Sequence, residues 1–482
     1  MPAPTRAANH ATRTNWLATE APRPRSIANW PSAGWLAVGT VCFGAFMGQL
    51  DASIVTLTFP ALRASFHASL AGVQWVSLSY LLTVVALLAP AGRLADALGR
   101  KQLYLYGFAL FTLGSAACGL APTLTALIGF RVLQGVGAAL LQANSVALVT
   151  TSVPANRMRT ALGIQAAAQA LGLALGPTLG GILVDALGWQ WVFGVNVPVG
   201  VLGLIAGRYL LPRTRQRTPV TGFDFLGLGL LVVATTALLL AVSSVSGLAL
   251  PVWSVAALLV VGLGAAVAFV LRGRRVRDGV IDLSLLRPRA VSGGLAAALG
   301  GYLVLFGPLV VVPVVLTAGG ASALRAGLVC TALPAGFGLA ATIGTRLVPG
   351  SWSNALRCVF GALLCVVALA PLALVPFGGV AFVALLGLLG VGLGLFTPPN
   401  NAMVMGAIPA AKSGLGGGLV NMARGIGTAL GVAVMTCVLN AAGLSEGARL
   451  AFGLLALLGI GVAGIAALAG RGGQEVLKEP ST

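Results

Sequence analysis

The stretch AGVQWVSLSYLLTVVALLAPAG at residues 71–92 contains no charged side chain and runs into the basic turn GRLADALGRK at residues 92–101. A helix rises about 1.5 Å per residue, so this stretch can reach about 33 Å and cross the hydrocarbon core of a bilayer, roughly 30 Å thick. An uncharged stretch of this length that ends in a basic turn predicts a transmembrane helix whose turn lies in the cytoplasm.

The same alternation of apolar stretch and polar turn continues along the chain. Of its 482 residues, 58% are apolar and 8% are charged, a balance that excludes a soluble domain. One span needs roughly 20 apolar residues. The stretches bounded by Pro, Gly or charge predict fourteen spans, at 34–60, 71–92, 102–121, 124–148, 160–184, 190–211, 224–246, 252–271, 291–316, 325–346, 356–376, 379–402, 414–440 and 449–470.

The basic residues indicate the direction of these spans. There are 29 Lys and Arg against 10 Asp and Glu, and the resulting charge of +19 would suggest a nucleic-acid partner for a soluble protein. With the N-terminus inside, 24 of the 29 lie in inner segments, and only Arg63, Arg325 and Arg449 lie in outer ones. This asymmetry predicts two cytoplasmic termini and leaves no need for nucleic acid. We expect a monomer in the lipid bilayer.

Connection lengths predict how the spans are grouped. The longest inner connections follow spans six and eight, so we expect an all-α membrane protein of fourteen transmembrane helices in a 6 + 2 + 6 arrangement. The expected parts are a disordered cytoplasmic tail (1–33), an N-terminal six-helix bundle (34–212), two inserted helices with basic linkers (213–290), a C-terminal six-helix bundle (291–470) and a second cytoplasmic tail (471–482).

Several motifs occur in order along the first block. They are the sequence LDAS at 50–53, the turn after span two, the run RVLQGVG at 131–137, the run GLALGPTLGG at 172–181, and WQW at 189–191 followed by NVPVG at 196–200. Together they resemble the fourteen-span drug:proton antiporter family of the major facilitator superfamily, over about residues 34–470. The turn departs from the family pattern only at Ala97, which stands where the family has a basic residue. The resemblance implies a major facilitator fold and proton-driven efflux.

The turn after span two has two interpretations. It can simply be a basic turn that orients the chain. In the family it is a gating loop, and the resemblance implies that Asp96 rests against the start of span thirteen, around 413–418, and closes the cytoplasmic side. A helix N-terminus favours such a carboxylate. The gating candidates are Gly92, Asp96, Gly99, Arg100 and Lys101.

The motif in span five also has two interpretations. Glycines on one face allow close helix packing wherever two helices meet. Pro177 removes a backbone hydrogen bond and permits a bend, which favours a flexing helix at the interface between the two blocks. The candidate residues of this antiporter motif are Gly172, Gly176, Pro177, Gly180 and Gly181.

Three charges lie well inside the predicted spans, namely Asp51, Arg131 and Arg424. By helix rise, Asp51 lies about 8 Å and Arg131 about 10 Å below the outer edge of the core. We therefore hypothesise that they interact and that Asp51 exchanges protons, the alternative being a static ion pair. Arg424 lies near the midplane without an obvious acidic partner, and either a structural or a substrate-binding role is open.

A central cavity would be lined by the remaining polar residues of the spans. These spans are otherwise apolar, which favours a small hydrophobic substrate. The cavity candidates are Trp75, Tyr80, Asn144, Gln165, Gln169, Tyr302, Asn400, Asn401, Asn421 and Arg424.

The leading functional hypothesis is a proton-driven exporter of hydrophobic drugs or antibiotic-like compounds across a bacterial plasma (inner) membrane. The alternatives are a dedicated exporter of one metabolite, a proton-coupled nutrient symporter, and a receptor that does not transport. No cluster of His, Cys or acids predicts an enzyme or a metal site, and no nucleotide-binding loop is present. We expect no cofactor, with the proton motive force as the energy source.

Overall fold

The computed structural model describes residue 20 and residues 23–154, 157–214, 224–245, 251–276, 283–349, 351–409 and 413–475. In this part of the chain every regular element is a helix. The first half contains α1 (Arg25–Ala28), α2 (Ala33–Ile54), the 3-10 turn η1 (Val55–Thr58), α3 (Phe59–Phe66), α4 (Leu70–Leu98), α5 (Arg100–Gly119), α6 (Leu124–Ser152), α7 (Met158–Leu187), α8 (Gln190–Gly194) and α9 (Asn196–Leu210).

The middle and the second half continue in the same way. They contain α10 (Phe225–Val245), α11 (Val252–Arg275), the 3-10 turn η3 (Leu283–Leu286), α12 (Arg289–Ala318), α13 (Ala323–Leu347), α14 (Asn354–Leu372), α15 (Val380–Gly406), α16 (Ser413–Ala442) and α17 (Leu444–Glu475).

A helix occupies each of the predicted apolar stretches. In the described residues, 12 helices are long and apolar enough to cross a membrane, so the chain is a multi-pass membrane protein. The other two are α5, which begins with Arg100 and Lys101, and α10, whose searched apolar stretch covers only Phe225–Leu238.

Short polar motifs determine where several helices begin and end. The hydroxyl groups of Ser69 and Thr123 accept hydrogen bonds from the backbone at the first turns of α4 and α6, 3.1 Å each. Ser322 does the same for α13, at 3.2 Å. Such caps satisfy backbone N–H groups that have no partner within the helix. Gly99 separates α4 from α5 with φ +113°, a backbone conformation that residues other than glycine rarely adopt.

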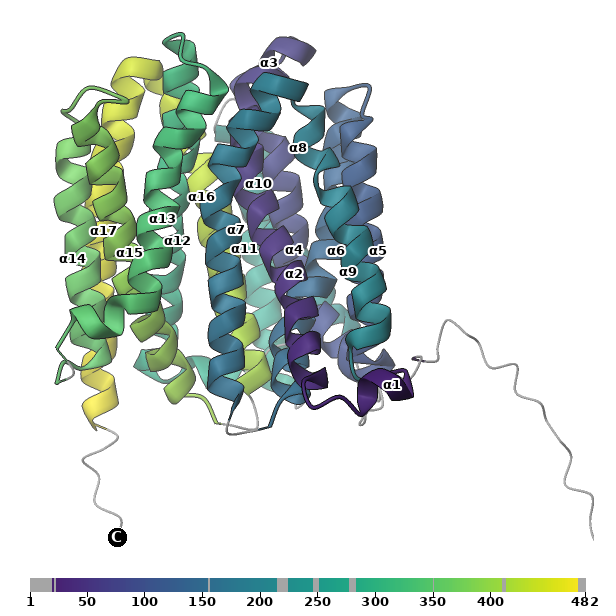
Figure 1. The fold of residues 1–482 in the computed structure, drawn as a ribbon. Helices are drawn as coiled ribbons and strands as arrows, with labels where there is room; N and C mark the ends of the chain where they lie inside the picture. The colour runs from purple at the N-terminus through teal and green to yellow at the C-terminus, as the bar shows by residue number, and fades with distance from the viewer. Residues whose placement is uncertain are drawn as a thin grey trace, which may run out of the picture.

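The helices form two bundles that lie side by side, with the first half in purple to teal and the second in green to yellow (Figure 1). Within the first half α2 packs on α7 and α6 on α4 and α5, and within the second half α15 packs on α13 and α14. The halves meet where α4 contacts α16 and α7 contacts α13. The pair α10 and α11 pack on each other, and α10 also contacts α4 and α16.

The start of α2 and the end of α17 lie at the same end of the bundle (Figure 1). At this end the expectation of a disordered tail up to residue 33 is wrong for its last part, because α1 is helical and Glu20 is only 4% exposed. Glu20 accepts hydrogen bonds from the backbone N–H groups of Thr214 (2.6 Å) and Gln102 (3.4 Å). A hydropathy profile cannot reveal a single carboxylate that accepts hydrogen bonds from backbone N–H groups.

Close helix contacts depend on glycine, and α15 offers the clearest test. A Cβ atom at Gly390 would overlap the carbonyl oxygen of Leu333 on α13, whereas Gly464 on α17 has open space around it. We predict that Gly390→Ala lowers the free energy of unfolding by about 1–3 kcal/mol through overpacking. Gly464→Ala is the matched control and should leave the thermal unfolding of the detergent-solubilised protein unchanged. Equal unfolding temperatures for the two variants would contradict this packing.

Candidate functional site

A buried ion pair lies inside the first bundle. The Nη1 group of Arg131 on α6 donates to Oδ2 of Asp51 on α2 at 2.7 Å, and the two side chains are 1% and 0% exposed. The contact expected from the depths of these residues is therefore present.

Two amide side chains complete the polar cluster around Asp51. Gln134, one turn after Arg131, donates from Nε2 to Oδ1 of Asp51 at 2.9 Å and to the hydroxyl of Ser115 at 2.6 Å. Its own Oε1 accepts from Arg131 at 2.6 Å. Asn196, the first residue of α9, donates to the same carboxylate at 3.2 Å. All of these polar groups are buried, so the cluster forms one network across α2, α5, α6 and α9.

The remaining surface of the Arg131 guanidinium is also covered. Its Nε donates to the carbonyl oxygen of Val76 on α4 at 2.8 Å. The ring of Tyr80 lies 4.1 Å and that of Phe193 5.7 Å from its Cζ atom, both within reach of a cation–π interaction. Tyr80, expected in a substrate cavity, thus lies against the ion pair, and its hydroxyl is buried without a hydrogen-bond partner.

Sequence reasoning did not assign Gln134 or Asn196 to this site. Gln134 had a usable signal, because a residue three positions after Arg131 lies on the same helix face. Asn196 had none, because its approach to Asp51 depends on the helix break between α8 and α9 and on how α9 packs against α2.

The antiporter motif in α7 has two packing faces. Gly172, Gly176 and Gly180 face α2, where added Cβ atoms would meet Phe46, Ser53 and Ile54. Gly181 and Pro177 instead touch α13 of the other half, close to Ala323 and Gly327. The expected interface between the two blocks is present on this second face.

Polar contacts reinforce the α7 and α13 interface. The hydroxyls of Thr178 and Thr331 are 2.6 Å apart. The carboxylate of Asp185, near the end of α7, accepts from the backbone N–H groups of Ala323 (3.1 Å) and Leu324 (2.8 Å) at the start of α13. Sequence reasoning missed Asp185. It closes one end of the interface by a bond between a carboxylate and a helix N-terminus.

The expected loop over residues 92–101 is almost entirely helical, since Gly92 and Asp96 lie within α4, Gly99 alone separates the two helices, and Arg100 and Lys101 begin α5. Lys101 is 1% exposed and donates from Nζ to the carbonyl oxygen of Leu211 at 2.9 Å, and the backbone N–H of Arg100 donates to Thr214 at 3.0 Å. Asp96 lies in the last turn of α4, but its side chain and those of residues 413–415 are outside the described part of the chain. The contact expected between them stays a prediction, although α4 and α16 do pack together.

The cavity candidates do not converge on one pocket. Asn144 donates to the carbonyl oxygen of Leu140, and Asn400 to that of Gly294, at 2.7 and 2.9 Å. Gln165 is 3% exposed, with its Nε2 group unpartnered. Tyr302, Asn421 and Arg424 do lie together, with Arg424 Cζ 5.2 Å from the Tyr302 ring centre.

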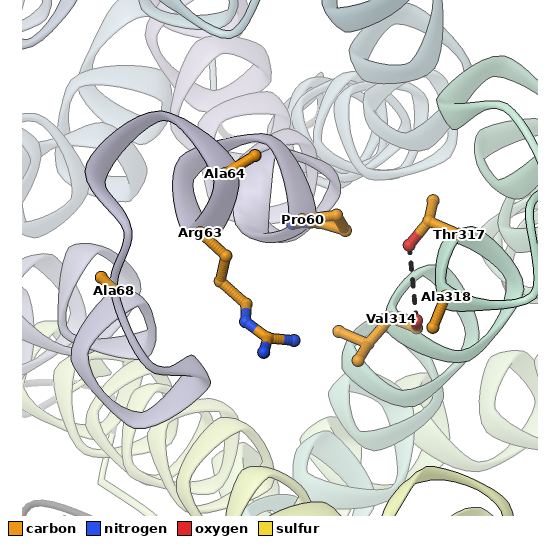
Figure 2. A pocket seen from close by; sticks show the side chains of 7 residues that line it. All are labelled: Pro60, Arg63, Ala64, Ala68, Val314, Thr317 and Ala318. Carbon is orange, nitrogen blue, oxygen red and sulfur yellow. Dashed lines mark hydrogen bonds between the residues drawn. The ribbon is translucent and has the colours of Figure 1, made fainter.

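A cavity of about 340 Å³ lies elsewhere, between α3 of the first half and α12 of the second. In Figure 2 the guanidinium of Arg63 extends into the gap toward Val314 and Thr317. None of the cavity candidates from the sequence lines this space, which is at the opposite end of the bundle from the start of α2 (Figure 1). Among the residues that the structure describes, no three His, Cys, Asp or Glu side chains group as a metal site would require.

The sequence matches known transporters along most of its length. The model of the Major Facilitator Superfamily matches residues 41–432. The riboflavin transporter RibZ of Clostridioides difficile (strain 630) is 31% identical over 406 residues, which covers 83% of this chain and 87% of that protein. The tetracenomycin C resistance and export protein of Streptomyces glaucescens is 32% identical over 429 residues, 86% of this chain and 78% of that one.

A third relative is similar in sequence, and one solved structure is similar in fold. The multidrug resistance protein Stp of Mycobacterium tuberculosis (strain ATCC 25618 / H37Rv) is 34% identical over 403 residues, 83% of this chain and 74% of its own length. The crystal structure of a peptide transporter in complex with sulfate has a TM-score of 0.69 at 18% identity and covers 95% of this chain and 98% of its own. At that identity the likeness concerns the fold alone.

The buried ion pair makes a prediction about stability. Replacing Arg131 by Met leaves the Asp51 carboxylate buried without its cation, so we expect the free energy of unfolding to fall by about 3–5 kcal/mol. The double variant Asp51→Asn/Arg131→Met removes both charges and should lose less than the sum of the single variants. Thermal unfolding in detergent measures both effects. Strictly additive losses would mean that the two side chains do not stabilise each other.

Proposed function

We propose, since the chain belongs to the major facilitator superfamily, that this transporter exports small hydrophobic, antibiotic-like compounds in exchange for protons by alternating access. Members of this family are transporters rather than enzymes. Two of the relatives are named for resistance or export, which supports the outward direction of transport. The proposal requires no cofactor, and the proton motive force supplies the energy.

The proposed topology has fourteen spans grouped as six, two and six. A helix in every predicted stretch supports this number, including the less apolar α5 and the shorter apolar stretch of α10. The excess of Lys and Arg in alternate connections supports cytoplasmic termini in the bacterial inner membrane. In this orientation Arg63 and the cavity between α3 and α12 lie at the outer end, and the transporter works as a monomer.

The observation that carries proton coupling is the buried Asp51. Its carboxylate accepts from Arg131, Gln134 and Asn196, on helices α6 and α9. A proton on Asp51 removes the negative charge that these three donors face and would weaken each of these bonds at once. Proton binding therefore loosens α2 from α6 and α9, and proton loss restores the network. An intramembrane acid of this kind is a common proton carrier.

Movement between the two bundles would occur at the α7 and α13 contact. α7 packs on α2 through the same motif that touches α13, so a shift of α2 is transmitted directly to the interface between the halves. Asp185 and Thr178 hold this interface at the proposed outer end. At the inner end we propose that Asp96 meets the start of α16. The two contacts would close opposite sides of the membrane in turn.

A dedicated exporter of one metabolite on the same fold is the second candidate. The observation in its favour is the similarity to a protein named as a riboflavin transporter, which is 31% identical over 406 residues. Export of one compound from a chemically varied panel supports this second candidate, and export of several unrelated compounds supports the first. A nutrient symporter is less consistent with the Gly and Pro motif of α7.

Proton coupling through Asp51 can be tested by one substitution. We expect Asp51→Asn to reduce gradient-driven dye export from proteoliposomes to the level of empty vesicles, because an amide cannot exchange the proton. Asp224→Asn is the matched control, since Asp224 forms the other described ion pair, with Arg272 at 2.6 Å, near the start of α10. That control should retain export. Normal proton-driven export by Asp51→Asn would exclude the proposed coupling.

The topology makes an independent prediction. In a variant whose six native cysteines are replaced, a single cysteine at Arg63 or Arg325 should react with an impermeant maleimide added to intact cells. A single cysteine at Arg274, in the last turn of α11, should react only after the cells are opened. Labelling of Arg274→Cys from outside would contradict the proposed direction of the spans.

A further inference from the structure

α16 carries a polar stripe at about the middle of its length. Asn421, Arg424 and Thr428 are spaced three and four residues apart, so they lie on one face of the helix. At about 1.5 Å per residue, Arg424 lies about 17 Å from the start of α16 at Ser413. This depth is close to the middle of a ~30 Å hydrocarbon core.

The stripe faces into the protein rather than toward lipid. Leu419 and Met422 of α16 pack with Leu231 of α10 and Phe269 of α11, so the inserted pair covers that side of the helix. A helix turns by about 100° per residue. The centre of the polar stripe therefore lies roughly 160° around the helix axis from the side that carries Leu419 and Met422.

The two helices that flank the stripe come from different halves. Gly427 and Gly431 of α16 lie against the backbone of Leu299 and Leu303 on α12, and Gly425 lies against Val85 on α4. By the same rotation these contacts fall on either side of the polar stripe. The stripe therefore points into the seam between α12 of the second half and α4 of the first, where alternating access would admit a substrate.

Arg424 has no anionic partner in the described part of the chain. Asp51 pairs with Arg131 and Asp224 with Arg272, so neither of these acids is the partner of Arg424. Asp51 is the only acid well inside the spans, and its carboxylate is already bound. A cation at this depth is costly unless water, a dipole or an anion compensates it.

The contacts that Arg424 does make are weak. Its Nη1 group donates to Oδ1 of Asn421 at 3.5 Å, the limit for a hydrogen bond. Its Nε group is buried without a partner. The ring of Tyr302 on α12 lies 5.2 Å from the guanidinium Cζ and stacks on Phe306, with 6.5 Å between ring centres and 21° between planes. An incompletely satisfied cation beside the ring of Tyr302 presents both charge and a flat apolar surface.

We propose that this cluster binds the negative charge of the substrate, and that the transporter accepts lipophilic aromatic compounds with one anionic oxygen, such as a carboxylate. Arg424 forms the charge-assisted hydrogen bonds, Tyr302 contacts the aromatic body with Phe306 packed behind its ring, and Asn421 orients the guanidinium. This inference rests on the proposed export function and specifies the chemical class of its substrate. A purely structural Arg424 would stabilise the protein without distinguishing charged from neutral ligands.

The test compares ligands that share one aromatic body and differ in charge. The probes are 2-naphthoate, the neutral 2-naphthamide and the cationic 2-naphthylmethylammonium. Their binding to the full chain is measured by calorimetry in nanodiscs of phosphatidylcholine, with empty nanodiscs subtracted. We expect the wild-type protein to bind 2-naphthoate about tenfold or more tightly than 2-naphthamide, as charged hydrogen bonds predict, and to bind the cation most weakly.

Substitutions at Arg424 test whether this residue causes the preference for the anion. Arg424→Gln should lose the preference for 2-naphthoate while its affinity for 2-naphthamide stays unchanged, and Arg424→Lys should keep part of it. Arg63→Gln is the matched control, because this cation also lacks a described acid partner but lies at the α3 cavity, and it should keep the preference.

Two results would overturn the proposal. The first is equal wild-type affinity for the anion and the amide, which needs no variant and so does not depend on whether Arg424→Gln folds. The second is an unchanged preference in Arg424→Gln or its loss in Arg63→Gln. The assay has no proton gradient, so its failure leaves proton-driven export standing. Active export by Asp51→Asn would in turn leave the anion site standing.

Discussion

The ion pair between Asp51 and Arg131 is the interaction on which the first bundle depends. Two opposite charges buried without water are tolerable only when geometry and further hydrogen bonds compensate their lost hydration. Gln134 and Asn196 supply those bonds, and Val76 accepts the last one from the guanidinium. Arg131 and Gln134 lie on α6, whereas Asp51, Val76 and Asn196 lie on α2, α4 and α9. The positions of α2, α4, α6 and α9 are therefore tied to one cluster.

The buried arginines of the two halves differ in how far their charge is compensated. In the first half Arg131 is fully compensated, and the network is neutral while Asp51 is ionised. In the second half Arg424 faces the seam with only a weak hydrogen bond to Asn421 and the ring of Tyr302. We therefore propose that the first bundle contains the proton site and the second bundle contains the substrate site. The tight α7 and α13 contact mechanically connects the bundles.

Much of the fold could be predicted because a bilayer demands it. The apolar stretches long enough to cross the hydrocarbon core are helical in the structure. The motif glycines of α7 lie at close helix contacts, as their spacing indicated. The depth argument also brought Asp51 and Arg131 together correctly. The site was predicted less completely. Asn196 and Asp185 entered it through packing between distant segments, and the buried Glu20 contradicted the expected disorder of the tail.

The sequence by itself determined the class of the protein, its family and the three charges that its spans contain, because hydropathy, charge placement and motif spacing are local properties of the chain. Only the tertiary structure decided how the pair of Asp51 and Arg131 is enclosed and which way Arg424 faces. Helix rotation and packing leave Arg131 enclosed by its partners, while they turn Arg424 toward the seam between α12 and α4. Rotation about a helix axis depends on contacts between segments far apart in sequence, and no local pattern specifies it.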